Sequence, residues 1–246
     1  MPDLTNVKAL VFDVFGTVVD WRTSVIREIQ ATAVSEALEG IDAPAMADDW
    51  RAGYPRVMQE TRDEKRPFAT IDTLHRAILD EDLAPKHHLE TLTEAARDHL
   101  NRAWHRLDAW PDSVAGLTQL KQRYTIATLS NGNVALLNNM AKRAGLPWDV
   151  VLSAELFGHF KPDPEVYLGA ARLLGLTPSE AMMVAAHPGD LRAAAAQGLR
   201  TAYLPRPLEW GPDREFRGKR EDDTFDLEVD SFVELTEVLD PSIVRR

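Results

Sequence analysis

Residues 7–12 read VKALVF and lead directly to an acidic residue, Asp13, and a turn, Phe15-Gly16-Thr17. A short apolar run of this kind is typical of a parallel strand that is buried on both faces. Similar runs follow at 124–129, 150–152, 181–186 and 200–204. Helical periodicity separates them, at 113–123, 134–144, 164–174 and 191–197. Alternating strands and helices predict an α/β fold, a doubly wound parallel sheet with helices on both faces.

The strand signal disappears after the first strand. Helical periodicity replaces it at 24–38, 45–62, 71–80 and 89–102. Pro44, Pro67 and the acidic stretch 80–82 punctuate these helices. The simplest layout is a helical cap, residues 20–104, inserted into a core formed by residues 1–19 and 105–246. The charged segment 206–224 is predicted to be a surface loop, followed by a short strand and a final helix.

Composition limits the classes of function. The 246 residues contain 28 Lys plus Arg against 39 Asp plus Glu, a net charge of −11, and no cysteine. Disulfides and thiolate metal sites are therefore excluded. An acidic chain repels nucleic acid and anionic lipid on average. No apolar run approaches the roughly 20 residues of a membrane span, so we expect a soluble cytoplasmic enzyme that binds neither nucleic acid nor membrane.

Polar residues follow the predicted strands where the strands end. They are Asp13, Thr17, Ser130, Asn131, Lys161 (in a loop) and Asp190. Ligands of open parallel sheets bind at the carboxyl ends of the strands, so this set predicts a site. Asp13 is the candidate nucleophile, because a carboxylate can form an ester and split one hard step into two. The alternative is that Asp13 only caps a loop.

Four ordered motifs resemble those of the haloacid dehalogenase superfamily. They are residues 12–17 (FDVFGT), 129–132 (LSNG), 161–164 (KPDP) and 189–190 (GD). The resemblance covers essentially the whole chain, including the cap after the first motif. It implies the Rossmann-like core and helical cap of that superfamily.

The residue two positions after Asp13 helps to distinguish the phosphatases of the superfamily from its dehalogenases. Phosphatases of the superfamily, which depend on magnesium, resemble one another in an Asp there that protonates the leaving alkoxide. Phe15 cannot transfer a proton, whereas a heavier halide leaves without an acid. The Asp-x-aromatic-Gly-Thr pattern also resembles the type II 2-haloacid dehalogenases, which use no metal or cofactor. The resemblance implies hydrolysis of short 2-haloacids (chloroacetate, bromoacetate and, in one branch, fluoroacetate) to 2-hydroxyacids through an aspartyl ester.

Two alternatives remain. One is a magnesium-dependent phosphatase for a small ester, in which Asp13 and Asp190 ligate the metal. The other is a non-catalytic protein that keeps the fold and binds a ligand.

The resemblance also implies roles for single residues of the core. Asp13 attacks the halogen-bearing carbon, Thr17 supports it, and Lys161 neutralises it. Ser130 and the backbone N–H of Asn131 hold the substrate carboxylate.

Further roles fall on the cap and the pocket walls. Arg51 receives the halide, although an isolated Arg is often only a solvated charge on a helix. Asp190 orients or deprotonates the water, and Tyr167 lines the wall beside Lys161. Phe15 and Trp21 line the substrate pocket, with core packing as the alternative.

The last motif departs from the Ser-Ser-Asn-x-x-Asp pattern of the dehalogenases. Residues 185–190 read AAHPGD, so His187 replaces the amide and Gly189 replaces a tryptophan of the pocket wall. A branch with Ala-Ala-His, and with Val-Asp-Trp-Arg as at residues 19–22, includes members similar to fluoroacetate-active enzymes. His187 is expected either to donate, with Arg51, to fluoride or the hydrolytic water, or to fix Asp190.

The other histidines show no metal-ligand spacing, and we expect surface or capping positions for those in the cap: His75, His87, His88, His99 and His105. No metal site is predicted. Relatives of this kind are often dimers, so the resemblance also implies a homodimer.

Overall fold

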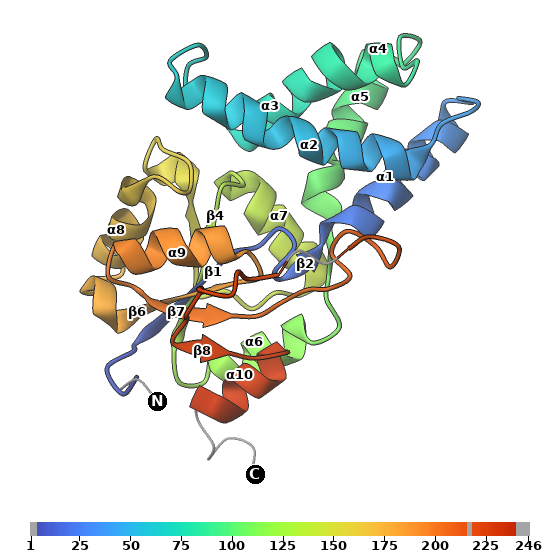
Figure 1. Cartoon of the computed structure of the whole chain (residues 1–246). Helices are drawn as coiled ribbons and strands as arrows, with labels where there is room; N and C mark the ends of the chain where they lie inside the picture. Colours follow the sequence, from blue (N-terminus) through green and yellow to red (C-terminus); the bar gives the residue numbers. More distant parts are fainter. Residues whose placement is uncertain (1–3, 216–217, 240–246) are drawn as a thin grey trace.

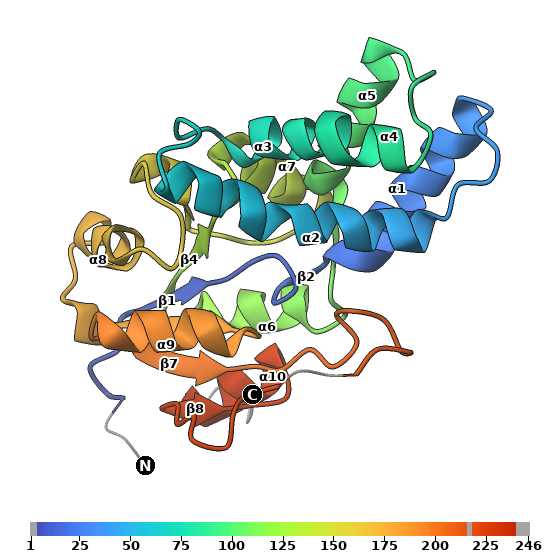
Figure 2. The ribbon, with the colours of Figure 1, turned by 45° about the horizontal axis from the view of Figure 1, so that its top comes forward.

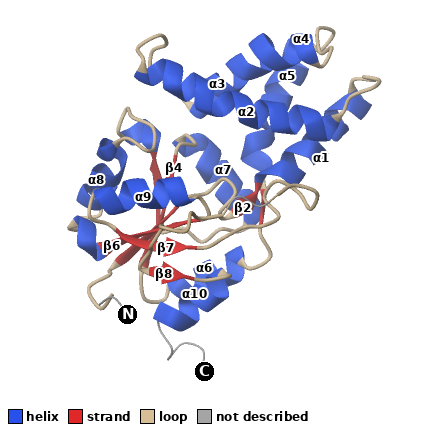
Figure 3. Ribbon diagram, in the orientation of Figure 1, coloured by secondary structure: helices blue, strands red, loops and turns tan. Residues whose placement is uncertain are grey.

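A parallel sheet forms the centre of the structure, a computed structural model that describes residues 4–215 and 218–239. The six strands lie in the order β5-β4-β1-β6-β7-β8, and every neighbouring pair is parallel (Figure 1, Figure 3). The strands are β1 (Ala9–Phe12), β4 (Thr125–Ser130), β5 (Val150–Ser153), β6 (Ala181–Ala185), β7 (Arg200–Tyr203) and β8 (Leu227–Glu228). The α/β fold and its predicted strands are confirmed.

Helices cover both faces of this sheet. They are α6 (Ser113–Leu120), α7 (Val134–Ala144), α8 (Pro164–Leu173), α9 (Pro188–Ala196) and α10 (Phe232–Leu239), with short 3₁₀ turns at Ala154–Leu156 and Pro178–Glu180. Leu10 and Phe12 pack in one buried cluster with α6, α7 and α10, while Val11 packs in another with α8 and α9. Side chains alternate across a strand, so β1 is buried on both faces and its last residue delivers Asp13 to the carboxyl edge.

The remaining helices form a separate layer above the carboxyl edge of the sheet (Figure 1, Figure 2). They are α1 (Trp21–Ser35), α2 (Ala43–Arg62), α3 (Ile71–Ile78), a π-helical turn (Leu79–Leu83), α4 (Ala84–Lys86), α5 (Glu94–Asn101) and a 3₁₀ turn (Arg102–Arg106). The chain enters this layer through β2 (Val19–Asp20) and leaves it through β3 (Asp108–Ala109), which pair antiparallel. We propose that this layer is the predicted cap, with its boundaries at this strand pair.

Several expected helix boundaries are wrong; for example, the helix expected at 24–38 runs from Trp21 to Ser35. The acidic stretch 80–82 does not end the helical segment that begins with α3, because residues 79–83 continue it as the π-helical turn. The helix expected from residue 89 begins at Glu94, because the Thr93 side chain accepts the N–H of Ala96 and caps it. The helix expected from residue 191 begins at Pro188, whose fixed φ suits a first turn, so Asp190 lies inside α9.

No helix in the two described ranges is long and apolar enough to cross a membrane.

Gly116 sets how closely α6 and α10 pack. A Cβ at this position would lie 2.3 Å from Phe232 Cβ and 2.8 Å from the Phe232 backbone carbon. We expect Gly116→Ala to destabilise the fold by about 1–3 kcal/mol through overpacking, although alanine favours helices by about 1 kcal/mol. Urea unfolding measures the change. Thr118→Ala, an exposed site of the same helix, is the control and should be near neutral; a Gly116→Ala protein as stable as wild type would contradict this packing.

Candidate active site

A cavity of about 330 Å³ lies where the core loops meet α2. Its wall contains most of the predicted site residues and some that were not predicted: Asp13, Phe15, Arg51, Tyr54, Ser130, Asn131, Lys161, Pro162, Tyr167, His187, Gly189 and Asp190. Three cations face two carboxylates in this wall. Volumes near 300 Å³ are at the low end for ligand pockets, so the cavity suits a small anion.

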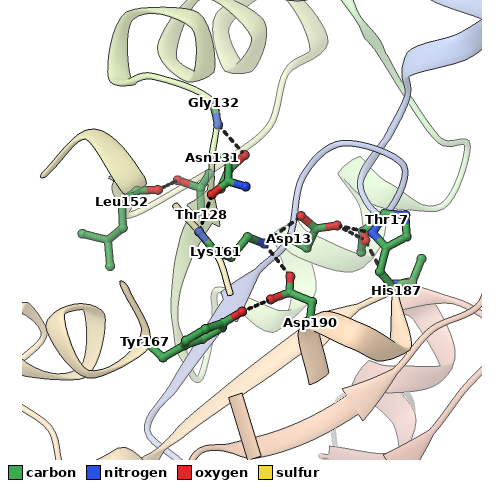
Figure 4. A network of polar contacts seen from close by, with 12 residues as sticks. Asp13, Thr17, Thr128, Asn131, Gly132, Leu152, Lys161, Tyr167, His187 and Asp190 are labelled. Carbon is green, nitrogen blue, oxygen red and sulfur yellow. Dashed lines mark hydrogen bonds and ion pairs between the residues drawn. The ribbon is translucent and has the colours of Figure 1, made fainter. Parts of the chain in front are cut away.

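Asp13 leaves the end of β1 and is held through both carboxylate oxygens (Figure 4). Oδ2 accepts from Thr17 Oγ1 at 2.7 Å and lies 2.9 Å from His187 Nδ1, while Oδ1 accepts from Lys161 Nζ at 2.9 Å. Gly16 allows this turn with a φ of +85°, and a Cβ there would meet Glu209 at 2.2 Å. Burial raises the pKa of Asp13, but Lys161 and His187 outweigh it and hold that pKa well below its usual range.

Lys161 joins the two carboxylates of the cavity. Its Nζ donates to Asp13 Oδ1 and, at 2.5 Å, to Asp190 Oδ2 (Figure 4). Burial lowers the pKa of Lys161, but the two carboxylates raise it above its ordinary value, so the ammonium stays charged. Tyr167 donates to the other oxygen of Asp190 at 2.5 Å. Burial nevertheless raises the pKa of Asp190, which makes this carboxylate the more ready proton acceptor of the pair.

His187 lies between two carboxylates. Nδ1 is 2.9 Å from Asp13 Oδ2, and Nε2 is 3.0 Å from Glu209 Oε2. An ionised carboxylate can only accept a hydrogen bond, so both ring nitrogens carry protons. Burial lowers the pKa of His187, but Glu209 and Asp13 outweigh it and raise that pKa to about 10. The expectation that the ring fixes Asp190 is therefore corrected: the ring contacts Asp13 and Glu209.

Glu209 is a charged residue beside the site that the sequence did not predict. It belongs to the expected surface loop, yet it is only 5% exposed and accepts from Trp21 Nε1 at 3.0 Å. The neighbouring Trp210 packs edge-on against Trp21. Burial raises the pKa of Glu209, but His187 lowers it below its ordinary value. Its flanking Trp210 was the one available signal, since a Glu-Trp pair inside a charged loop is unusual for a fully solvated segment.

Arg51 enters the cavity from α2. Its guanidinium lies over the Tyr54 ring, 4.8 Å from the centroid, and 5.6 Å from the centroid of Trp21. Nη1 is buried and has no hydrogen-bond partner among the described residues. A buried charged donor without a partner costs free energy, so this atom is available to an anion. The alternative of a solvated helix charge is not supported.

His75 is buried among Trp50, Tyr54 and Trp104, contrary to the expected surface position. It is fully buried and stacks on Trp104 with the ring centroids 4.2 Å apart. Burial and, to a lesser extent, the Arg51 charge lower the pKa of His75 to about 3, so the ring is neutral at pH 7.

The loop after β4 supplies Ser130 and Asn131. Ser130 Oγ accepts the Gly132 N–H at 3.1 Å and keeps its own proton for donation. The Asn131 side chain has an additional function that was not predicted: Oδ1 accepts the backbone N–H of Lys161 at 2.7 Å. Asn131 Nδ2 contacts Met58 Sδ of α2 at 3.3 Å.

Two predicted residues lie outside the cavity wall. Thr17 is fully buried, where its hydroxyl donates to Asp13 and accepts the Ala186 N–H at 2.9 Å. Trp21 is also fully buried and stacks on Trp104. The expectation that Trp21 lines the substrate pocket is corrected, because this ring supports Arg51 and Glu209 from behind.

The donor set does not fit a magnesium ion. Asp13 and Asp190 each direct one oxygen at Lys161 Nζ, and the other oxygens accept from Thr17, His187 and Tyr167. Across residues 4–215 and 218–239, no group of three or more His, Cys, Asp or Glu side chains is placed to hold a metal.

The His187 pKa can be measured directly. We expect ¹⁵N chemical shifts to report a doubly protonated ring to about pH 9, because the pKa lies near 10. This pKa exceeds the unfolded value of about 6.5. The stabilising contribution is therefore complete below pH 6.5 and is lost as pH rises through 10. Glu209→Gln should lower the His187 pKa by removing one carboxylate. Titration of the wild-type ring near pH 6.5 would contradict the arrangement.

Comparisons with known proteins agree with this geometry. Residues 7–198 match the family described as haloacid dehalogenase-like hydrolase. (S)-2-haloacid dehalogenase 4A of Burkholderia cepacia is 31% identical over 82% of this chain and 84% of its own, and (S)-2-haloacid dehalogenase 1 of Pseudomonas sp. (strain CBS-3) is 30% identical over 85% and 91%.

Solved structures agree as well. A crystal structure of an L-2-haloacid dehalogenase is 45% identical over 96% of this chain and 100% of its own, with a TM-score of 0.88. A defluorinating L-2-haloacid dehalogenase is 44% identical over 95% of both chains, with a TM-score of 0.90. These likenesses support the expected carbon–halide hydrolase. The chain belongs to the haloacid dehalogenase-like hydrolases, in the branch that contains the 2-haloacid dehalogenases.

Proposed function

We propose that this protein hydrolyses short 2-haloacids to 2-hydroxyacids, with Asp13 as the nucleophile and without a cofactor. The observation that carries the proposal is an ionised carboxylate, Asp13, in the wall of a small cavity that also holds the buried, unpartnered Nη1 of Arg51. The nucleophile and an acceptor for the departing anion thus share one cavity. The net positive charge of the wall suits a substrate with one carboxylate.

The first step is displacement at carbon. Asp13 Oδ1 has one donor, Lys161, whereas Oδ2 has two, Thr17 and His187. Oδ1 is therefore the freer oxygen and attacks the halogen-bearing carbon, while the carbon–halogen bond breaks and Arg51 accepts the halide. Ser130 Oγ and the Asn131 N–H bind the substrate carboxylate. Tyr54 and Phe15 complete the apolar part of the wall.

The second step is hydrolysis of the aspartyl ester. Once Oδ1 is alkylated, Oδ2 is the ester carbonyl oxygen. Water attacks Cγ, and its proton passes to Asp190, the carboxylate with the raised pKa. The negative charge that develops on Oδ2 meets the His187 imidazolium and the Thr17 hydroxyl. Collapse releases the hydroxyacid, whose oxygen takes the proton back from Asp190, and the re-formed carboxyl group of Asp13 loses its proton to solvent.

The role of His187 also bears on the range of halides. Fluoride is the poorest leaving group among the halides, so the positive charge of His187 beside Asp13 favours its departure, while both ring N–H groups stay bound to Asp13 and Glu209. The likeness to a defluorinating enzyme supports including fluoroacetate beside chloroacetate and bromoacetate.

A phosphatase is the weaker candidate. It would need an acid for the alkoxide, and Phe15, which lines the cavity, provides none. The four oxygens of Asp13 and Asp190 are also directed at protein donors.

Halide release tests the function. Ion chromatography of reactions with fluoroacetate and chloroacetate, with a chelator present, should detect halide from wild type. Asp13→Asn should reduce the rate by more than about 10⁴-fold, since it removes the nucleophile. Release of phosphate from small esters, dependent on magnesium, together with no halide release, would favour the phosphatase. No turnover of either class would favour the binding protein.

The oxyanion role of His187 has its own test. His187→Asn should slow ester hydrolysis by about 10²–10³-fold and slow fluoride release more than chloride release. Mass spectrometry of the quenched enzyme should then detect an accumulating adduct on Asp13. Equal losses for the two halides would oppose an effect of the His187 charge on fluoride release, and a variant without an adduct would oppose the role in hydrolysis. His159→Asn, in the same chain region as Lys161 but 46% exposed, is the matched control.

The proposal retains three further expectations: a cytoplasmic location, a homodimer, and no binding of nucleic acid. The net charge of −11 supports the last of these.

A further inference from the structure

One face of α2 touches the active site at four positions. Intervals of three and four residues keep side chains on one face of a helix, and the side chains at these intervals are Arg51, Tyr54, Met58 and Arg62. The first two line the cavity, and Met58 contacts Asn131. Arg62, the last residue of α2, reaches beyond the cavity to the Lys161 loop, residues 157–163.

Arg62 binds this loop through a side chain and the backbone. Nε donates to Asp163 Oδ1 at 2.8 Å, and Nη2 donates to the carbonyl oxygens of Lys161 at 2.7 Å and Phe160 at 3.4 Å. A planar guanidinium can serve several acceptors in one geometry, which an ammonium cannot. The contact fixes the backbone of Lys161 rather than its ammonium.

The Lys161 residue is therefore anchored from two sides. Its N–H donates to Asn131 Oδ1 at the end of β4, and its C=O accepts from Arg62 at the end of α2. The first anchor belongs to the core and the second to the helical layer. Lys161 Nζ in turn lies 2.9 Å from the nucleophile.

The contact between Arg62 and the Lys161 loop can break and form again. Arg62 and Asp163 are 24% and 21% exposed, beside a cleft of about 710 Å³ that both residues line. Water reaches this ion pair, and partly exposed pairs contribute little to stability. The contact can break without unfolding either part.

We propose that Arg62 is a positioning residue that latches α2 to the Lys161 loop, so that Lys161 is held against Asp13 only while α2 lies over the cavity. Closure of the site and activation of the nucleophile become one event. When α2 moves away from the cavity, Asp13 is exposed to solvent and Lys161 is no longer held against it. The inference rests on the proposed role of Asp13 as nucleophile.

The first test is kinetic. Arg62→Gln keeps the aliphatic stem but removes the charged fork. We expect ester formation, measured as the single-turnover halide burst at saturating substrate, to slow by about 10- to 100-fold. The acidic limb of the pH profile should move to higher pH, because a displaced Lys161 no longer holds down the Asp13 pKa. Arg62→Lys keeps the charge but not the planar fork, so its burst rate should lie between those of Arg62→Gln and wild type. A merely structural role would leave the pH profile unchanged.

The control variant lies on the same helix. Arg56→Gln removes ion pairs with Glu60 and Asp82, both within the helical layer, and should leave burst rate and pH profile at wild-type values. In a Lys161→Ala background, Arg62→Gln should cost little more, because the two residues act in series. Multiplicative losses in the double variant, or an unchanged burst in Arg62→Gln, would overturn the latch.

An observation without substrate separates this inference from the proposed function. The Lys161 amide should exchange its hydrogen faster in Arg62→Gln than in wild type or Arg56→Gln. If wild type releases no halide but exchange responds, the function fails and the latch stands. If wild type is active and neither exchange nor burst responds, the latch is wrong. Urea unfolding confirms that Arg62→Gln is folded, and Arg62→Lys replaces it if not.

Discussion

The Lys161 ammonium is the constraint on which the site depends. Asp13 and Asp190 are buried close together, and two buried carboxylates of like charge repel each other and lose their hydration. One cation shared between them, 2.9 Å from the first and 2.5 Å from the second, makes the arrangement stable. This sharing ties the end of β1, the first turn of α9 and the Lys161 loop together. A second cation, His187, lies between Asp13 and Glu209 and contacts both carboxylates. Asp13 is thus kept ionised by its neighbours.

The sequence predicts the core well because its signals are local. The apolar runs define strands, the polar residues after them define the carboxyl edge, and the topology brings Asp13, Ser130 and Lys161 into one wall. Asp13 and Ser130 need only their own strand to be placed, whereas Lys161 lies in a loop that Asn131 and Arg62 hold. The end of α7 is another local signal, because Gly145 adopts the φ of +72° that ends the helix.

The misses have a common physical cause, which is contact between distant segments. Glu209 contacts His187 and Trp21, at separations of 22 and 188 residues, and in its own loop only the neighbouring Trp210 indicates burial. In the sequence, Arg62 does not differ from other surface arginines, since its partners in the Lys161 loop lie about 100 residues away. Trp21 and His75 are fully buried, and their burial depends on how α1, α2 and α3 pack against one another. Periodicity reports that a face is buried, not against which partner.

The antiparallel pair of β2 and β3 places both crossings between the layers side by side. An insertion whose ends are adjacent adds no strain to the sheet that receives it, whatever its length or sequence. Selection can therefore exchange or remodel the helical layer as a module while β1, β4 and β6 keep their register. The helical layer supplies Arg51 and Tyr54 to the cavity wall, so remodelling it changes one wall of the site while Asp13, Lys161 and Asp190 of the core stay in place.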